Sequence, residues 1–163
     1  MPILTFPDEI YELYRELLSR LPQGAATLAR QPSGDPSGGE DIVVTPANSN
    51  SAAICLHPGG DIIYTGIGRH TTMELWVSSR KYEEQELGKL QKISRAVIDG
   101  KFSEDVLMVN GKIVRSQGMF EIDGRMQKMG GFLTFFNPLR RKQWQHFDYA
   151  PYVQPGTQTT TPM

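Results

Sequence analysis

The feature that most constrains the fold is a pair of turn dipeptides placed between runs of strand-forming residues. Asn110-Gly111 separates residues 106–109 from 112–122, and Asp123-Gly124 separates the latter from 125–129. Both residues of such a dipeptide accept the positive φ that a two-residue type I′ hairpin turn requires. The sequence therefore predicts three antiparallel strands joined as a meander, which Gly130-Gly131 is expected to end.

The predicted meander has two apolar faces, although a sheet with one face in water needs only one. Its expected core face holds Leu107, Val109, Val114, Phe120 and Ile122. The opposite face holds Val106, Met108, Ile113, Arg115, Met119 and Met126. Methionine side chains reshape at little cost and suit contact with other proteins. The alternative is that this second face packs against residues 132–136 or a helix.

Two amphipathic helices are predicted on either side of a strand-rich segment. In residues 7–21 apolar side chains recur at the spacing of one helical stripe, and Thr5 is the expected N-cap. Residues 80–99 form the second helix, which Gly100 is expected to end. Gly88 inside it predicts close packing against a strand.

Short strands account for most of the remaining sequence. They are predicted at 41–45, 52–57, 61–66, 71–78 and 141–149. Short connections between strands imply antiparallel pairing. We therefore predict an α+β fold, with one twisted antiparallel sheet of about seven strands covered by two helices, in the order α-β4-α-β3/4.

The predicted fold occupies one domain, residues 1–153, because 163 residues suit a single domain. Within it, residues 23–40 are rich in Gly, Pro and Ser and are expected to be a flexible loop in which only 25–30 could form a helical turn. Residues 154–163 are expected to form a disordered tail.

The charge balance and the single cysteine exclude several classes of protein. A formal net charge of −1 gives no general reason to expect nucleic acid or an anionic membrane as a partner, although a local basic patch remains possible. Cys55 is the only cysteine, so neither an intrachain disulfide nor a four-cysteine zinc site can form. The sequence shows no secretory signal and no apolar run of roughly 18 residues, so we expect a cytoplasmic protein.

Cys55 and His57 form the first combination with possible chemistry. They lie two positions apart on a predicted strand, where a thiol and an imidazole would face the same side. However, Ile54 and Leu56 flank the cysteine, which favours a buried structural role. We predict no catalytic residue.

The histidines and the basic residues give no firmer site. His57, His70 and His146, with Asp61 and Glu74, lack the spacing of a zinc site, so neither a metal nor a cofactor is predicted. Residues 140–142 (Arg-Arg-Lys), with Trp144 and His146, have the composition that single-stranded nucleic acid needs. In a chain of balanced charge they more commonly protect an exposed sheet edge, which argues against nucleic acid.

The leading hypothesis is a non-enzymatic protein-binding module, of the kind seen in toxin-neutralising immunity proteins or secretion-type chaperones. Its expected partner-binding residues are Trp76, Met108, Ile113, Arg115, Met119 and Met126. The alternative is a cone-like α+β fold that binds a small molecule or catalyses a reaction, with a pocket formed by Cys55, His57, Tyr64, His70 and Glu74. A homo-oligomer that buries the methionine-rich face is a third possibility.

Overall fold

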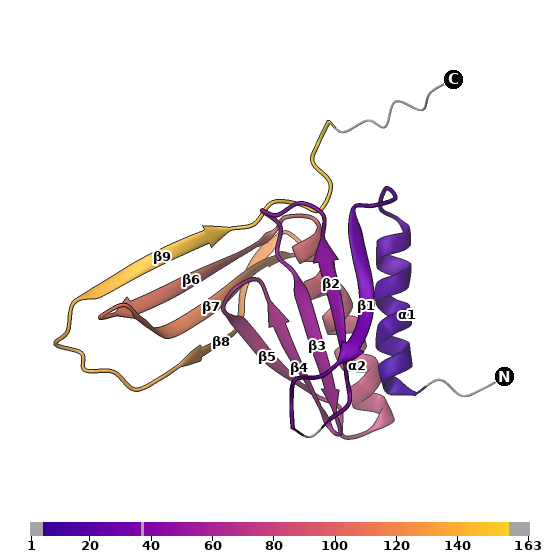
Figure 1. The fold of residues 1–163 in the computed structure, drawn as a ribbon, viewed down its shortest axis with the longest axis horizontal. Coiled ribbons are helices and arrows are strands. Elements are labelled where there is room, and N and C mark those ends of the chain that lie inside the picture. Colours follow the sequence, from indigo (N-terminus) through magenta and orange to yellow (C-terminus); the bar gives the residue numbers. More distant parts are fainter. Residues whose placement is uncertain (1–4, 37, 157–163) are drawn as a thin grey trace.

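The computed structural model describes residues 5–36 and 38–156 and has an α+β fold with two helices and two antiparallel sheets (Figure 1). Strands β1 (Ala26–Pro32), β2 (Glu40–Pro46), β3 (Ile54–Gly59), β4 (Ile62–Ile67) and β5 (Thr71–Trp76) form a five-stranded sheet in chain order. Strands β6 (Phe102–Val109), β7 (Lys112–Ile122), β8 (Arg125–Leu133) and β9 (Lys142–Asp148) form a four-stranded sheet in the order β8-β7-β6-β9. The predicted α+β class with two helices and antiparallel strands is confirmed, but the described strands form two sheets instead of one and number nine instead of about seven, in the order α-β5-α-β4.

The two helices cover one face of the five-stranded sheet. Helices α1 (Phe6–Ser19) and α2 (Arg80–Ile98) contribute Ile10, Leu90 and Ile93 to a core that includes Leu56 and Ile63 of the sheet. Alternate residues of β3, β4 and β5 are buried in it, so the opposite face of this sheet is open to solvent. No helix within the described residues is long and apolar enough to cross a membrane.

The helix cap and the two hairpin turns that were predicted from local sequence are present in the structure. Thr5 caps α1 in a reciprocal capping box, and hydrogen bonds from Thr5 and Arg30 lower the pKa of Asp8 to about 2. The two meander turns have positive φ at both central residues, with 51° at Asn110 and 52° at Asp123. These values confirm the predicted hairpins.

Residues 23–40 do not form one flexible loop, and residues 25–30 form no helical turn. Ala26–Pro32 is strand β1, which pairs with β2 in continuous register from Ala26 opposite Pro46 to Pro32 opposite Glu40. Most side chains of β1 are exposed, because it is the edge strand of its sheet and buries few apolar residues. The predicted tail, 154–163, lies mostly outside the described residues.

Glycine positions account for two further corrections. The position of a Cβ on Gly88 has no described neighbour within 4 Å apart from its own helix and adjacent residues, so the expected close packing against a strand is wrong. Gly130 and Gly131, with φ of 67° and 95°, do not end the meander; β8 continues through them to Leu133. A Cβ on Gly130 would lie 2.7 Å from the Thr72 carbonyl oxygen, so the glycine allows β8 to lie directly against β5.

The four-stranded sheet meets the core only at one end. Phe102, Phe120 and Ile122 join the main core, whereas Leu107, Val109 and Val114 form a separate cluster covered by Phe136. Figure 1 shows this sheet extending away from the helices, with the β8–β9 connection at its far end.

Candidate functional site: an open groove between the sheets

The open face of the five-stranded sheet carries a row of polar and aromatic side chains. His57 on β3 lies opposite Tyr64 on β4, which lies opposite Glu74 on β5. Cys55 lies on the same face, in register with Gly66 of β4. Cys55, His57, Tyr64 and Glu74 of the predicted pocket thus share one surface.

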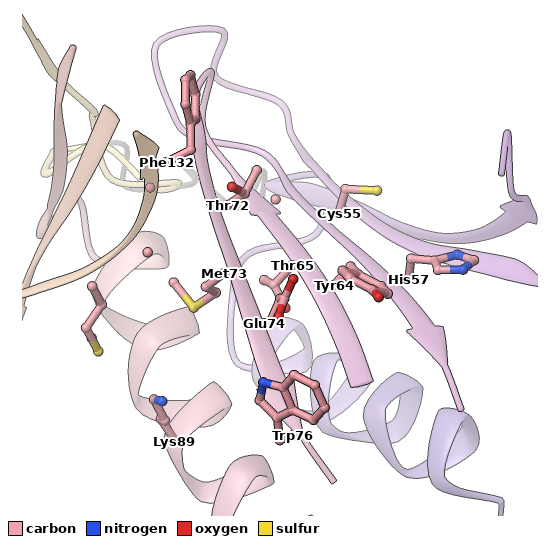
Figure 2. Close-up of a pocket in the computed structure, with 14 residues that line it drawn as sticks. Cys55, His57, Tyr64, Thr65, Thr72, Met73, Glu74, Trp76, Lys89 and Phe132 are labelled. Atoms are coloured by element: carbon pink, nitrogen blue, oxygen red, sulfur yellow. The ribbon is translucent and has the colours of Figure 1, made fainter. Parts of the chain in front are cut away.

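This surface is one wall of an open groove with a volume of about 910 Å³, and β8 forms the other wall. Three exposed aromatic residues from three strands lie along the groove: Tyr64, Trp76 and Phe132, whose side chains are 47%, 59% and 37% exposed. Figure 2 shows Trp76 at one end, Phe132 at the other and Tyr64 between them. The groove is therefore elongated, with aromatic surface along its length.

A paired histidine lies at the margin of the groove. Nδ1 of His57 lies 2.8 Å from a carboxylate oxygen of Asp41, and the two side chains are only 15% and 16% exposed. The His57 ring also contacts that of Tyr64, with 6.3 Å between ring centroids. The carboxylate fixes the orientation of the imidazole, which is how a general base or a ligand-binding histidine is held.

Cys55 is exposed on this face, so its predicted burial is wrong. Packing around the sulfur, followed by the negative charge of Asp41, raises the pKa of the Cys55 thiol. A nucleophilic cysteine needs a lowered pKa, usually from a nearby cation or helix N-terminus. The surroundings of Cys55 have the opposite effect, and the thiol stays protonated at neutral pH.

The other two histidines lie away from the groove. His70 is in the β4–β5 turn, with its ring 6.1 Å from that of Phe147. His146 is on β9, hydrogen-bonded to Asp105 and Asp148. In the part of the chain that the structure describes, no three His, Cys, Asp or Glu side chains could together hold a metal ion.

A bulge divides the methionine-rich face that was predicted to bind a partner. The β6–β7 register shifts by one residue just before Met108. Opposite residues of an antiparallel ladder share a face, so a one-residue shift moves side chains to the other side. Arg115, Met119 and Met126 consequently share one face, whereas Met108 pairs with Ile113 on the other. Trp76 lies on neither, because it belongs to the groove.

The residue that organises the junction between the sheets was not predicted. Glu104 of β6 is fully buried, and its carboxylate accepts hydrogen bonds from the backbone N–H groups of Arg69 and His70 and from the hydroxyls of Thr71 and Tyr149. Burial, and then the hydrogen bond to Glu104, raises the pKa of Tyr149 above its ordinary value, so the phenol keeps the proton that it donates. An acidic residue within a strand-forming run was the available signal.

Three other contributors to the groove also went unpredicted. Asp41 is close to His57 only because β2 pairs with β3, and Phe132 reaches the groove only because Gly130 brings β8 against β5. Lys89 comes from α2, on the far side of β5.

Compared with known proteins, the chain matches no family model, no curated protein and no solved structure.

Proposed function

We propose that this chain is a protein-binding module whose groove receives an extended segment of a partner protein. The observation that carries the proposal is the spacing of Phe132, Tyr64 and Trp76, all exposed, along one open hollow. Trp and Tyr are among the residues that dominate binding energy at protein interfaces. Exposing all three to water serves no purpose in the fold itself.

The walls of the groove favour an extended occupant over a compact ligand. Strand β5 ends the five-stranded sheet and β8 ends the four-stranded sheet, so two edge strands border the groove; they touch at Thr72 and Gly130, and an occupant would use their edges beyond that contact. Extended peptides bind at such edges through their backbone, and alternate side chains enter neighbouring pockets. The groove is also too open to enclose a small molecule, and several of its lining residues are exposed.

The charges that line the groove suggest the sequence of the occupant. Glu74 lies on the edge strand β5, opposite Tyr64 of β4. It forms no salt bridge with any described residue. Lys89, the cation of the groove, lies 3.9 Å from Glu86. A fitting occupant would place an aromatic or aliphatic side chain against Trp76 and a basic side chain opposite Glu74.

The test is selection of random peptides displayed on phage against the purified chain, followed by affinity measurements on a selected peptide. Trp76→Ala should weaken binding at least about tenfold, because buried aromatic anchors commonly contribute about 2 kcal/mol or more. The matched control is Tyr82→Ala, which removes a half-exposed aromatic side chain from α2 outside the groove. Equal affinity of the wild type and Trp76→Ala would refute the groove as the binding site.

The Asp41–His57 pair supports a second candidate, a small-molecule or catalytic site at the same margin of the groove. Two substitutions separate the candidates. A peptide-binding groove should tolerate Cys55→Ser and His57→Ala and lose binding on Trp76→Ala. A site that depends on the imidazole would show the reverse pattern.

A further inference from the structure

The far half of the four-stranded sheet is strongly basic, although the whole chain is nearly neutral. This half comprises residues 106–116 and 132–145, which contain five of the 17 Lys and Arg residues and none of the 18 Asp and Glu residues. The five cations are Lys112, Arg115, Arg140, Arg141 and Lys142. None of them forms a salt bridge with a described acidic residue. We call residues 133–144, with Lys112 and Arg115, the wing tip.

The three most exposed large apolar side chains among the described residues, those of Phe135, Leu139 and Leu133, all lie in the wing tip. Phe135 is fully exposed, Leu139 is 92% exposed, and Leu133 and Trp144 are more than half exposed. Phe135 and Leu139 lie in the connection between β8 and β9, at the end of the sheet farthest from the helices (Figure 1). This places apolar and cationic side chains together on a protruding end of the molecule.

The wing tip has a supporting structure beneath these exposed side chains. Leu107, Val109 and Val114 form the small cluster that Phe136 covers. The Val114 carbonyl, at the bulge, accepts a hydrogen bond of 2.7 Å from the backbone N–H of Thr134, which attaches the connection to the sheet. The connection is therefore held on a small core of its own.

Two of the wing-tip cations lie close to aromatic rings. The Arg115 guanidinium lies 6.0 Å from the ring centroid of Trp144, and the Lys142 ammonium lies 5.5 Å from that of Phe136. Lys112 and Lys142 both lie opposite Val109, on either side of it in the sheet. Cationic and aromatic side chains thus lie side by side on this part of the sheet.

Protection of a sheet edge accounts for only part of this arrangement. Strand β9 ends its sheet, and Lys or Arg on such an edge discourages pairing with another chain. That purpose explains Lys142, but it gives no reason for Phe135 and Leu139 to be exposed. Single-stranded nucleic acid would use the rings, but it has no use for exposed aliphatic side chains such as Leu133 and Leu139. A protein partner would need a cavity shaped to the protruding end.

We propose that the wing tip binds an anionic lipid surface. Phe135 and Leu139 enter the boundary between headgroups and acyl chains, and Arg140, Arg141 and Lys142 contact the lipid phosphates. Apolar side chains surrounded by Lys and Arg are the combination that such surfaces attract, and a bilayer adapts its shape to a protruding loop. The groove ends on β8 at Phe132, next to Leu133 of the wing tip, whereas Phe135 and Leu139 lie beyond it in the β8–β9 connection. This inference therefore rests on other residues than the peptide-binding proposal and is independent of it.

The test is flotation of the full chain with vesicles of neutral phosphatidylcholine, and with vesicles that also contain phosphatidylserine. The wild type should float only with the anionic vesicles, and binding should weaken as salt is raised. The double variant Arg140→Gln/Arg141→Gln should lower the partition coefficient about 25-fold, since each basic residue near an anionic surface contributes about fivefold. Phe135→Ser/Leu139→Ser should lower it about tenfold or more.

Matched controls separate the wing tip from charge and apolarity elsewhere. Lys81→Gln/Arg125→Gln removes two exposed cations, and Tyr82→Ser removes a half-exposed aromatic residue, all outside the wing tip. These variants should float like the wild type. Equal flotation with neutral vesicles, no flotation at all, or equal losses in the controls would overturn the proposal. So would tight binding of a single-stranded oligonucleotide by a wild type that does not float, because the anionic partner would then be nucleic acid.

Discussion

Replacement of Glu104 by glutamine tests whether the junction between the two sheets is held as the structure indicates. Each carboxylate oxygen accepts two hydrogen bonds: Oε1 from the Arg69 N–H and the Tyr149 hydroxyl, and Oε2 from the His70 N–H and the Thr71 hydroxyl. Glutamine keeps the shape but replaces one acceptor oxygen with an NH2 group. In one orientation the amide NH2 group faces the His70 N–H, and in the other it faces the Arg69 N–H, which also has the Tyr149 hydroxyl oxygen as an acceptor at 3.0 Å.

The expected loss of stability follows from these contacts. A hydrogen bond to a charged acceptor is worth about 1.5–3 kcal/mol, and a buried donor without a partner costs about 1–3 kcal/mol. The hydroxyls can rotate, so the main loss is one charge-assisted bond and the displaced bond of one backbone N–H, which for Arg69 is partly replaced by the Tyr149 hydroxyl oxygen. Together they predict a decrease of about 2–5 kcal/mol in the free energy of unfolding. That is a large fraction of the 5–15 kcal/mol typical of a domain.

Urea unfolding followed by circular dichroism measures this decrease. Glu121→Gln is the matched control, because Glu121 lies on the adjacent strand β7 and forms an exposed ion pair with Lys101 at 3.3 Å. Such pairs contribute about 0–1 kcal/mol, so the control should unfold almost like the wild type. A decrease below about 1 kcal/mol for Glu104→Gln, with an unchanged urea dependence, would refute the role assigned to the carboxylate.

Two other features of the fold give predictions for the same unfolding assay. Gly131→Ala should destabilise the protein by more than about 2 kcal/mol, because the φ of Gly131 is 95° and a Cβ there would lie 2.1 Å from a carbonyl oxygen of β7. Gly88→Ala, in open space on α2, should instead stabilise the protein by about 0.5–1 kcal/mol. Destabilisation by Gly88→Ala, or a neutral Gly131→Ala, would contradict the packing seen here. Hydrogen bonds to Asp105 and Asp148 raise the pKa of His146 above its usual 6.5, so its stabilising effect is complete below about pH 6.5 and is lost as the pH rises through the higher folded-state pKa. His146→Gln should therefore destabilise the protein at about pH 6 but not at about pH 9, and a pH-independent difference would show that the ring gains no proton affinity on folding.

The elements that could be predicted from the sequence are those set by local chemistry. The capping box at Thr5 and the positive φ values at Asn110 and Asp123 depend on residues only a few positions apart. Strand β1 was missed because an edge strand needs little apolar surface, and its sequence resembles a loop. The division into two sheets depends on where Gly130 lets β8 meet β5, a contact between residues far apart in the chain.

The groove shows the same limit for the candidate site. The alternation of strand residues is enough to predict that Cys55 and His57 share a face, and pairing of neighbouring strands adds Tyr64 and Glu74. His70 was included only because of its chemistry, and the turn that contains it directs its backbone toward Glu104. For the methionine-rich face, one extra residue in β7 reverses the side on which Met108 lies relative to Arg115, and no sequence pattern marks that bulge.

The junction has different consequences for the two proposed surfaces. The walls of the groove belong to different sheets, so its width depends on contacts such as the 2.7 Å hydrogen bond from the Ser116 hydroxyl to the His70 carbonyl. A change in the angle between the sheets would move Phe132 relative to Trp76 and alter every contact of an extended occupant. The wing tip has its own apolar cluster beneath Phe136, and a bilayer imposes no fixed spacing on the side chains that enter it. Peptide binding should therefore be sensitive to the junction, whereas lipid binding should depend only on the wing tip.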